Sequence, residues 1–274
     1  MHFFLVLVSI FFSSIASAKI IEIQSFKELP SYVNEKTLLL LDIDDTLLIP
    51  SHMLGCDEWF NHRIKFYVDQ GMDAKLSLEK TLGEWEAIRH LSNMEIVEKG
   101  TESILQDLQK DGFTVMGLTT QGVGLSHCTI NHLLQNQIEL FSSAPFKEPF
   151  YFEQKNRGVL FRKGVLFTAG TDKGICLFKL CDHFGYVPQK IVFINDKATH
   201  LQEIEAEAAK RGVEFIGLRY GYNDAKKQNF DPKIAEIQFH NSSFQSILTD
   251  DHAFEKKIDD ILLDSLESEE NETP

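Results

Sequence analysis

The chain has 274 residues, 25% of them charged, and a formal net charge of -14 at pH 7. Much of this negative charge lies at residues 250–274, which hold ten acidic residues and two lysines. No basic patch of the kind that binds nucleic acid occurs in the sequence, so we expect no nucleic-acid partner.

The four cysteines are too few and too scattered for a disulfide scaffold, and they form no C-x-x-C metal motif. Cys176 and Cys181 are predicted to lie on one helix, where their spacing holds the Cα atoms beyond disulfide reach. Cys56 and Cys128 could pair in an oxidising compartment, although buried free thiols are the commoner state.

Residues 1–18 are predicted to be a secretory signal peptide. Residues 3–15 are apolar apart from three serines, and Ala16-Ser17-Ala18 is a small-residue cleavage signal, although no Lys or Arg precedes the apolar run. The run is shorter than the roughly 20 residues that span a bilayer, so we expect no stable membrane span. We therefore expect export to the periplasm or beyond, with a mature chain that begins at Lys19.

Two carboxylates follow an apolar stretch at 38–41 that is long enough to be a buried strand. Asp42 and Asp44 would leave this strand on the same side, at the edge where open α/β folds bind ligands. One carboxylate can attack a phosphorus atom while the other handles the proton of the leaving group. Their combined charge favours a hard cation such as Mg2+. The alternative is a turn that only caps the following helix.

Residues 51–99 are longer than a loop needs to be and are predicted to form a helical insertion. Apolar side chains recur there at helical spacing in two stripes, which we expect to form a small core rather than a platform for stacking bases. The stripes are Trp59, Phe60, Ile64, Tyr67 and Val68, and then Leu78, Leu82, Trp85, Ile88 and Leu91. Candidates for contacts with a leaving group are His62, Arg63, Arg89 and His90, although most charges on such helices are solvated.

A helix at 102–110, stopped by Gly112, is predicted to lead into a strand at 114–118. The strand ends in the hydroxyls of Thr119 and Thr120. Either hydroxyl is equally consistent with a helix N-cap.

A hairpin is predicted at 150–161, with Asn156-Arg157-Gly158 as its turn, followed by a strand at 165–167. The next helix begins near Asp172 and carries Lys173 in its first turn, where the helix dipole disfavours a cation. An anion in front of Lys173 would explain this position, and a solvated surface lysine is the alternative.

The apolar run at 191–194 predicts a strand that ends in Asn195 and Asp196, and 214–218 predicts another. Because these strands alternate with helical segments, the fold class is predicted as α/β, with a Rossmann-like, doubly wound parallel sheet. We expect a core domain at 19–50 and 100–249, the insertion at 51–99, and an acidic tail at 250–274. Residues 203–210 are predicted as an exposed helix, a further helix starts at Asp231-Pro232, and disorder is expected from residue 267.

Taken in chain order, these strand ends resemble the four motifs of the haloacid-dehalogenase-like (HAD) superfamily. The run Asp42-Ile43-Asp44-Asp45-Thr46 resembles motif I, Thr119 or Thr120 motif II, Lys173 motif III and Asp196 motif IV. The resemblance covers residues 37–220. Within the superfamily, the chain most resembles the exported HAD-like proteins of intracellular bacteria. It implies that the insertion at 51–99 is a cap that closes over the active site and selects the substrate.

The resemblance also implies a phosphatase that acts on a phosphorylated small molecule. Asp42 would be the nucleophile and form an aspartyl-phosphate. Asp44, two residues later, would be the general acid and then the general base, because family members with other reactions lack an acid at that position.

In the same way, Thr119 or Thr120 would bind the phosphate together with Lys173. Mg2+ would be bound by Asp42, the backbone carbonyl of Asp44 and Asp196. The family usually supplies a second acid next to Asp196 or four residues later, and here Asn195 and His200 stand in those places. This departure leaves an alternative, a binding protein that retains the pocket but has little or no turnover. The sequence gives neither the physiological substrate nor the oligomeric state.

Overall fold

The computed structural model describes residues 18–243 and 247–271. Its first strand, β1 (Ala18–Ile23), begins at the last residue of the predicted signal peptide, and residues 1–17 lie outside the described part. None of the helices in the described ranges is long and apolar enough to cross a membrane.

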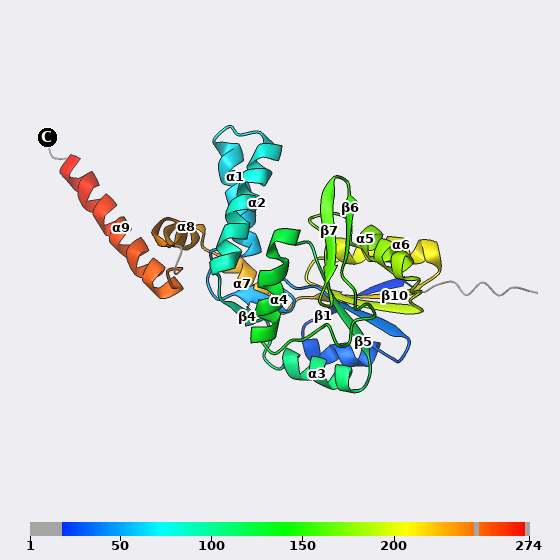
Figure 1. The fold of residues 1–274 in the computed structure, drawn as a ribbon. Coiled ribbons are helices and arrows are strands. Elements are labelled where there is room, and N and C mark those ends of the chain that lie inside the picture. Colours follow the sequence, from blue (N-terminus) through cyan, green and yellow to red (C-terminus); the bar gives the residue numbers. More distant parts are fainter. Residues whose placement is uncertain (1–17, 244–246, 272–274) are drawn as a thin grey trace, which may run out of the picture.

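An eight-stranded sheet forms the centre of the molecule, in the order β1-β10-β9-β2-β5-β8-β7-β6 (Figure 1). Pairing is parallel from β1 to β8, and β7 and β6 extend one edge in antiparallel pairing. The strands after β1 are β2 (Thr37–Leu41), β5 (Thr114–Thr119), β6 (Phe150–Gln154), β7 (Arg157–Arg162), β8 (Val165–Phe167), β9 (Lys190–Asn195) and β10 (Glu214–Tyr220). The chain winds outward from β2 in both directions, so the predicted Rossmann-like, doubly wound fold is confirmed.

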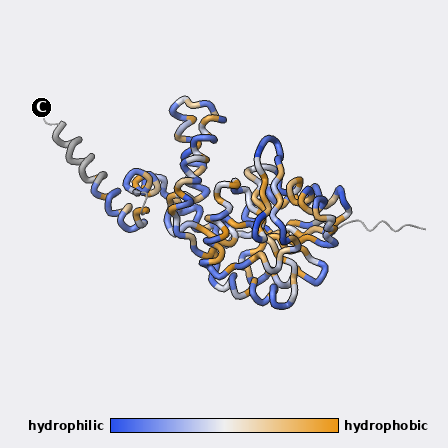
Figure 2. Tube along the Cα trace, viewed as in Figure 1, coloured by the Kyte–Doolittle hydropathy of each residue, from blue (hydrophilic) through white to orange (hydrophobic). Residues whose placement is uncertain are grey.

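Helices bury both faces of this sheet, because alternate residues of a strand point to opposite sides. In β2, Leu39 and Leu41 belong to one hydrophobic cluster, and Leu38 and Leu40 belong to the other. The first cluster includes η1 (Phe26–Tyr32), α3 (Thr101–Lys110) and α4 (Ser126–Gln135), and the second includes α5 (Lys173–Phe184) and α6 (Ala198–Arg211). Figure 2 shows hydrophobic residues gathered along the strands between these layers.

The cap segment, residues 51–99, contains two helices that stand away from the sheet (Figure 1). They are α1 (Asp57–Asp69) and α2 (Ala74–Leu91), and a two-stranded antiparallel ribbon of β3 (Leu48–Pro50) and β4 (Met94–Ile96) connects them to the core. Helix α8 (Pro232–Asn241) packs on α1, where the ring centroids of Trp59 and Phe239 lie 5.6 Å apart. A segment distant in sequence therefore supports the outer side of the cap segment.

Two local predictions are wrong in detail. The hairpin turn consists of Lys155 and Asn156, which have φ values of 50° and 60°, so Arg157 already lies in β7. A two-residue turn with positive φ at both positions matches the twist of the flanking strands. Residues 203–210 are not simply an exposed helix, because Ile204 and Ala208 are fully buried against the sheet.

The C-terminal prediction needs a further correction. Helix α9 (Asp250–Asn271) continues past residue 267, so the disorder expected from that position is wrong for 267–271. Its first turns are tied to α8, since Lys257 forms an ion pair with Asp231 and Gln238 Nε2 donates to Asp250 Oδ1 at 2.5 Å. All four cysteines are free thiols, so Cys56 and Cys128 do not pair.

A close approach of α5 to α6 at Gly174 predicts a stability effect. A Cβ atom at Gly174 in α5 would lie 2.2 Å from the backbone oxygen of Glu203 in α6. We expect Gly174→Ala to lower the free energy of unfolding by about 1–3 kcal/mol, because the helices must separate. In Gly83→Ala, on an exposed turn of α2 with nothing within 4 Å of the added Cβ, stability should stay the same or rise by up to about 1 kcal/mol. Urea unfolding of both variants measures this, and a Gly174→Ala protein as stable as the wild type would contradict the close contact.

Candidate active site

Asp42 and Lys173 form a buried ion pair at the carboxyl end of β2. The backbone N–H of Asp42 donates to the carbonyl of Ile194 at 3.1 Å, which holds the residue between β2 and β9. Lys173 Nζ lies 2.7 Å from Asp42 Oδ1 and also donates to the carbonyl of Leu118 at 3.1 Å. Lys173 is 0% exposed, so it is not a solvated surface lysine. A buried ammonium needs such partners, because desolvation without them is very costly.

The environment of Asp42 strongly affects its proton affinity. Burial raises the pKa of Asp42 to about 7, although the Lys173 ammonium opposes the shift. The carboxylates of Asp196 and Asp44 raise it further. The carboxylates of Asp44 and Asp196, which the sequence predicts at this edge, are therefore close enough to affect the pKa of Asp42.

Asp44 is held by two side chains from different parts of the chain. Its Oδ1 forms an ion pair with Arg89 of α2, and its Oδ2 accepts a hydrogen bond of 2.8 Å from Gln121 Nε2. Gln121 is itself fixed, since its side-chain oxygen accepts a hydrogen bond from Thr129 of α4. Arg89, a candidate for contact with a leaving group, instead binds the predicted general acid.

The structure distinguishes the environments of the two candidate hydroxyls. Thr119 is the last residue of β5 and is 1% exposed, and its hydroxyl accepts the backbone N–H of Gln121 at 3.2 Å. Its carbonyl accepts the backbone N–H and the hydroxyl of Thr168. Thr120, one residue beyond the strand, lines the cavity in front of Asp42.

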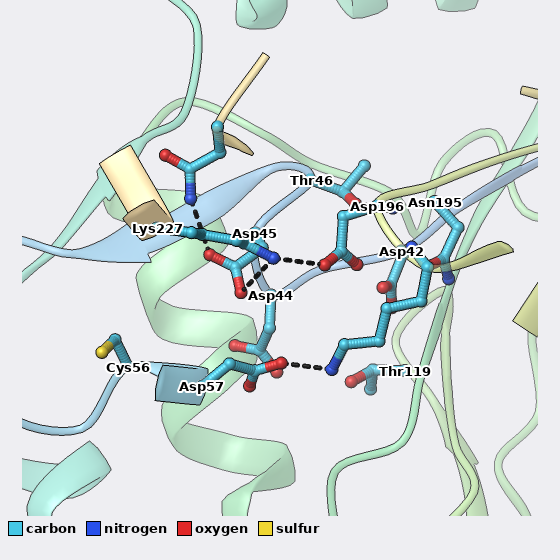
Figure 3. A network of polar contacts seen from close by, with 12 residues as sticks. Asp42, Asp44, Asp45, Thr46, Cys56, Asp57, Thr119, Asn195, Asp196 and Lys227 are labelled. Atoms are coloured by element: carbon cyan, nitrogen blue, oxygen red, sulfur yellow. Dashed lines mark hydrogen bonds and ion pairs between the residues drawn. The ribbon is translucent and has the colours of Figure 1, made fainter. Parts of the chain in front are cut away.

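A cluster of three carboxylates lies beside Asp42 (Figure 3). Oxygen atoms of Asp45, Asp57 and Asp196 all lie within 4.8 Å of one another. Asp45 sits in a tight turn with φ of 59°, a conformation that Asp tolerates better than most residues. Of these three acids, the sequence predicted only Asp196 as a metal ligand. The third acid in the run from Asp42 was a usable signal, whereas Asp57 reads as an ordinary acid at a helix start.

Lysines neutralise this cluster. Lys227, from α7 (Asp224–Gln228), has its Nζ 2.6 Å from Asp196 Oδ2 and 3.2 Å from Asp45 Oδ2. Figure 3 marks both ion pairs with dashed lines. Lys197 forms an ion pair with Asp57. Burial and the nearby Asp57 carboxylate raise the pKa of Asp45 to about 8, against the effect of Lys227. Burial disfavours the charged form of Lys197, but the carboxylates of Asp57 and Asp196 together outweigh it, so the pKa of Lys197 is raised.

The donor atoms of the cluster suit a hard cation. Three carboxylates offer only oxygen, the ligand preferred by Mg2+ over softer metals. The neighbouring His200 lines the cavity, and burial together with Lys173 and Lys197 lowers its pKa to about 3. The side-chain oxygen of Asn195, which stands in the place of a second acid, accepts the backbone N–H of Lys197 at 2.7 Å.

A cavity of about 740 Å3 lies in front of Asp42 and Asp44. Its wall combines the sheet edge, the cap segment and the hairpin. The lining includes Asp57, Phe60, Asn61, Leu78, Leu82, Trp85, Glu86, Thr120, Gln121, Val123, Tyr151, Arg157, Ala169, Lys197 and His200. None of the cap residues proposed to contact a leaving group lines it. Arg63, for example, is buried in ion pairs with Glu84 of α2 and Glu236 of α8.

Comparison with known proteins identifies relatives over most of the chain. A protein of Chlamydia pneumoniae named "Putative outer membrane protein" is 24% identical over 245 residues, covering 86% of this chain and 88% of its own. A protein of Chlamydia muridarum with the same name is 24% identical over 228 residues, covering 82% and 85%.

Solved structures with a similar arrangement include a HAD-superfamily hydrolase from Geobacter sulfurreducens, with 13% identity, a TM-score of 0.38, and coverage of 70% of this chain and 99% of its own. A phosphoserine phosphatase has 13% identity, a TM-score of 0.34, and coverage of 72% and 100%. The family model described as "Protein of unknown function (DUF2608)" matches residues 22–254, most of the chain. The chain therefore belongs to this family.

Proposed function

We propose that the protein is a Mg2+-dependent phosphate-ester hydrolase that works through an aspartyl-phosphate on Asp42. One observation carries the proposal. Asp42 lines a cavity while its carboxylate is held 2.7 Å from the fully buried Lys173, and the Asp44 carboxylate lines the same cavity. A nucleophilic oxygen, a fixed positive charge and a second carboxyl are the groups that phosphoryl transfer to an aspartate requires.

The proposed reaction has two steps. An oxygen of Asp42 attacks the phosphorus and the bond to the alcohol breaks, while Asp44 gives its proton to the departing oxygen. Asp44 then takes a proton from a water molecule that attacks the phosphorus of the aspartyl-phosphate, which releases phosphate and restores Asp42. Lys173 offsets the charge of Asp42 and of the phosphoryl group, and the hydroxyl of Thr120 or Thr119 binds a phosphate oxygen.

A divalent cation would be held on the side of Asp42 where the other acids gather. Asp196 is both one of the metal ligands expected from the sequence and a member of the carboxylate cluster. Asp45 and Asp57 offer further oxygen ligands. Such an ion supplies charge neutralisation for the phosphoryl group. Arg89 and Gln121 orient the Asp44 carboxyl independently of it.

One observation favours a second candidate, a binding protein with little turnover. Lys227 places an ammonium between Asp196 and Asp45, where it neutralises two of the acids that a cation would use. Together with Asn195, which replaces the usual second acid, this weakens the expected affinity for the metal.

The first prediction tests the nucleophile. In Asp42→Asn, hydrolysis of an aryl phosphate in Mg2+ should fall by at least about a thousandfold, because the amide cannot form the covalent intermediate. In Asp44→Asn it should fall by about 10^2–10^4-fold through loss of the general acid and base. Asp111→Asn, an exposed site at the end of α3, is the matched control and should keep full activity.

Acid-quenched wild-type enzyme should carry a phosphoryl group on the peptide that contains Asp42. Circular dichroism should show that each variant remains folded. Wild-type rates in a folded Asp42→Asn protein would refute the mechanism, and a wild-type protein inactive on a broad phosphate panel would favour the binding protein.

The second prediction concerns Lys227 and the cation. Lys227→Met should lower the stability of the metal-free protein by about 3 kcal/mol, because buried carboxylates lose their partner. The same change should strengthen Mg2+ binding, so that Mg2+ raises the melting temperature more than in the wild type. Lys226→Met is the control, since Lys226 pairs with Glu95 outside the cluster. Calorimetric titration and melting curves measure both effects, and equal Mg2+ affinity in the two variants would contradict the proposed cation position.

The third prediction concerns export. We propose cleavage after Ala18, and the names of the similar chlamydial proteins, which refer to the outer membrane, support an envelope or exported location. Cleavage there would leave five of the six residues of β1 in the mature chain. Mass spectrometry of protein from its native host should show Lys19 as the first residue. An intact Met1 on cytoplasmic protein would contradict export and leave the hydrolase proposal standing.

A further inference from the structure

Apolar side chains of the cap segment line part of the cavity in front of Asp42 and Asp44. Leu78, Leu82 and Trp85 recur along one face of α2, and Phe60 faces them from α1. All four were predicted to form the core of the cap segment. Trp85 and Phe60 do belong to its hydrophobic cluster and also line the cavity, whereas Leu78 and Leu82 line the cavity outside that cluster. Val123, at the start of the segment that leads into α4, continues the same surface from the core side.

The aromatic rings of this wall are fixed in place. The Trp85 Nε1–H donates to the carbonyl of Gly55 at 2.9 Å, so its polar atom is already satisfied. The Phe60 ring packs on Trp85 in an edge-to-face arrangement, with centroids 6.0 Å apart. From the hairpin, Tyr151 adds a third ring to the lining and is 57% exposed. The Trp85 and Phe60 rings, held in this way, can receive a flat apolar group without a large loss of side-chain entropy.

Polar groups line the cavity as well. Asp42, Thr120 and Lys197 line it on the sheet edge, where a phosphate would bind under the proposed function, and the cap helices add Asn61 and Glu86 beside their apolar residues. At the hairpin side, Arg157 is anchored by a hydrogen bond of 3.0 Å to the carbonyl of Ala169. A volume of about 740 Å3 lies within the range of drug-sized ligand sites and far exceeds the needs of a phosphate group alone.

We propose that the substrates are phosphate monoesters whose alcohol carries an aromatic ring. This inference rests on the proposed function for the phosphate end and on the apolar wall for the other end. A ring that leaves water for the surface of Phe60, Leu82 and Trp85 gains hydrophobic and aromatic stabilisation. A compact polyhydroxylated alcohol would instead leave these apolar side chains in contact with water or with hydroxyl groups and would gain none of this stabilisation.

Two ligand pairs test the substrate class. For hydrolysis, 2-phenylethyl phosphate is compared with ethyl phosphate, because both release a primary alcohol and differ in the ring. We expect kcat/KM to be at least about tenfold higher for the phenylethyl ester. For binding without hydrolysis, 2-phenylethylphosphonate is compared with ethylphosphonate by calorimetry, with the same expected preference.

Matched variants locate the preference on the apolar wall. Leu82→Ser should reduce the preference for the phenylethyl compounds about fivefold and leave the ethyl compounds almost unchanged. Leu76→Ser, on the same helix but outside the cavity and 53% exposed, should change neither.

Equal phosphonate affinities, or equal loss in the two leucine variants, would overturn the aromatic class. Failure to hydrolyse either ester, combined with a preserved phosphonate preference, would refute the hydrolase function and support the aromatic site.

Discussion

The central constraint on this structure is the charge gathered at the carboxyl edge of its sheet. Five aspartates lie there, and their mutual repulsion in a poorly hydrated space must be offset before the edge can form. The aspartates are Asp42, Asp44, Asp45, Asp57 and Asp196, and the cations paired with them are Lys173, Arg89, Lys227 and Lys197. The fully buried pair of Lys173 and Asp42 lies at the topological centre of this arrangement, where β2 meets β9.

Because the compensating charges come from distant segments, the site and the cap segment depend on each other. Arg89 of α2 binds Asp44, and Asp57 at the start of α1 binds Lys197 after β9. Both cap helices are therefore attached to the core through residues at the candidate site. A movement of the cap segment would change the partners of the proposed general acid and of the acidic cluster together. The position of the cap helices, which line the cavity, is therefore coupled to the ion pairs of Asp44 and Asp57.

The cavity combines charged groups at the sheet edge with apolar side chains of the cap segment, and the proposed substrate class follows from this division. The charged groups come from strand ends and loops of the core, and the cap helices add Asp57 and Glu86. The apolar side chains come mainly from one face of each cap helix, and those helices are supported on their outer side by α8 through Trp59 and Phe239. An apolar wall of this kind would select among phosphate esters by their alcohol group rather than by their phosphate group. Both candidate functions, hydrolase and binding protein, would use the same division.

The sequence by itself determined the doubly wound sheet, and it placed Asp42, Asp44 and Asp196 at strand ends near one another. Apolar strand runs and the common edge of parallel strands are local, periodic features, so they can be read from one chain. The sequence did not reveal β1, the contribution of Asp57, or Lys227 between Asp45 and Asp196. It also assigned Leu78 and Leu82 to a core instead of a cavity. Only the tertiary structure decided these points, because charge pairing and cavity walls arise between residues far apart in the chain, and no local pattern encodes which distant groups will meet.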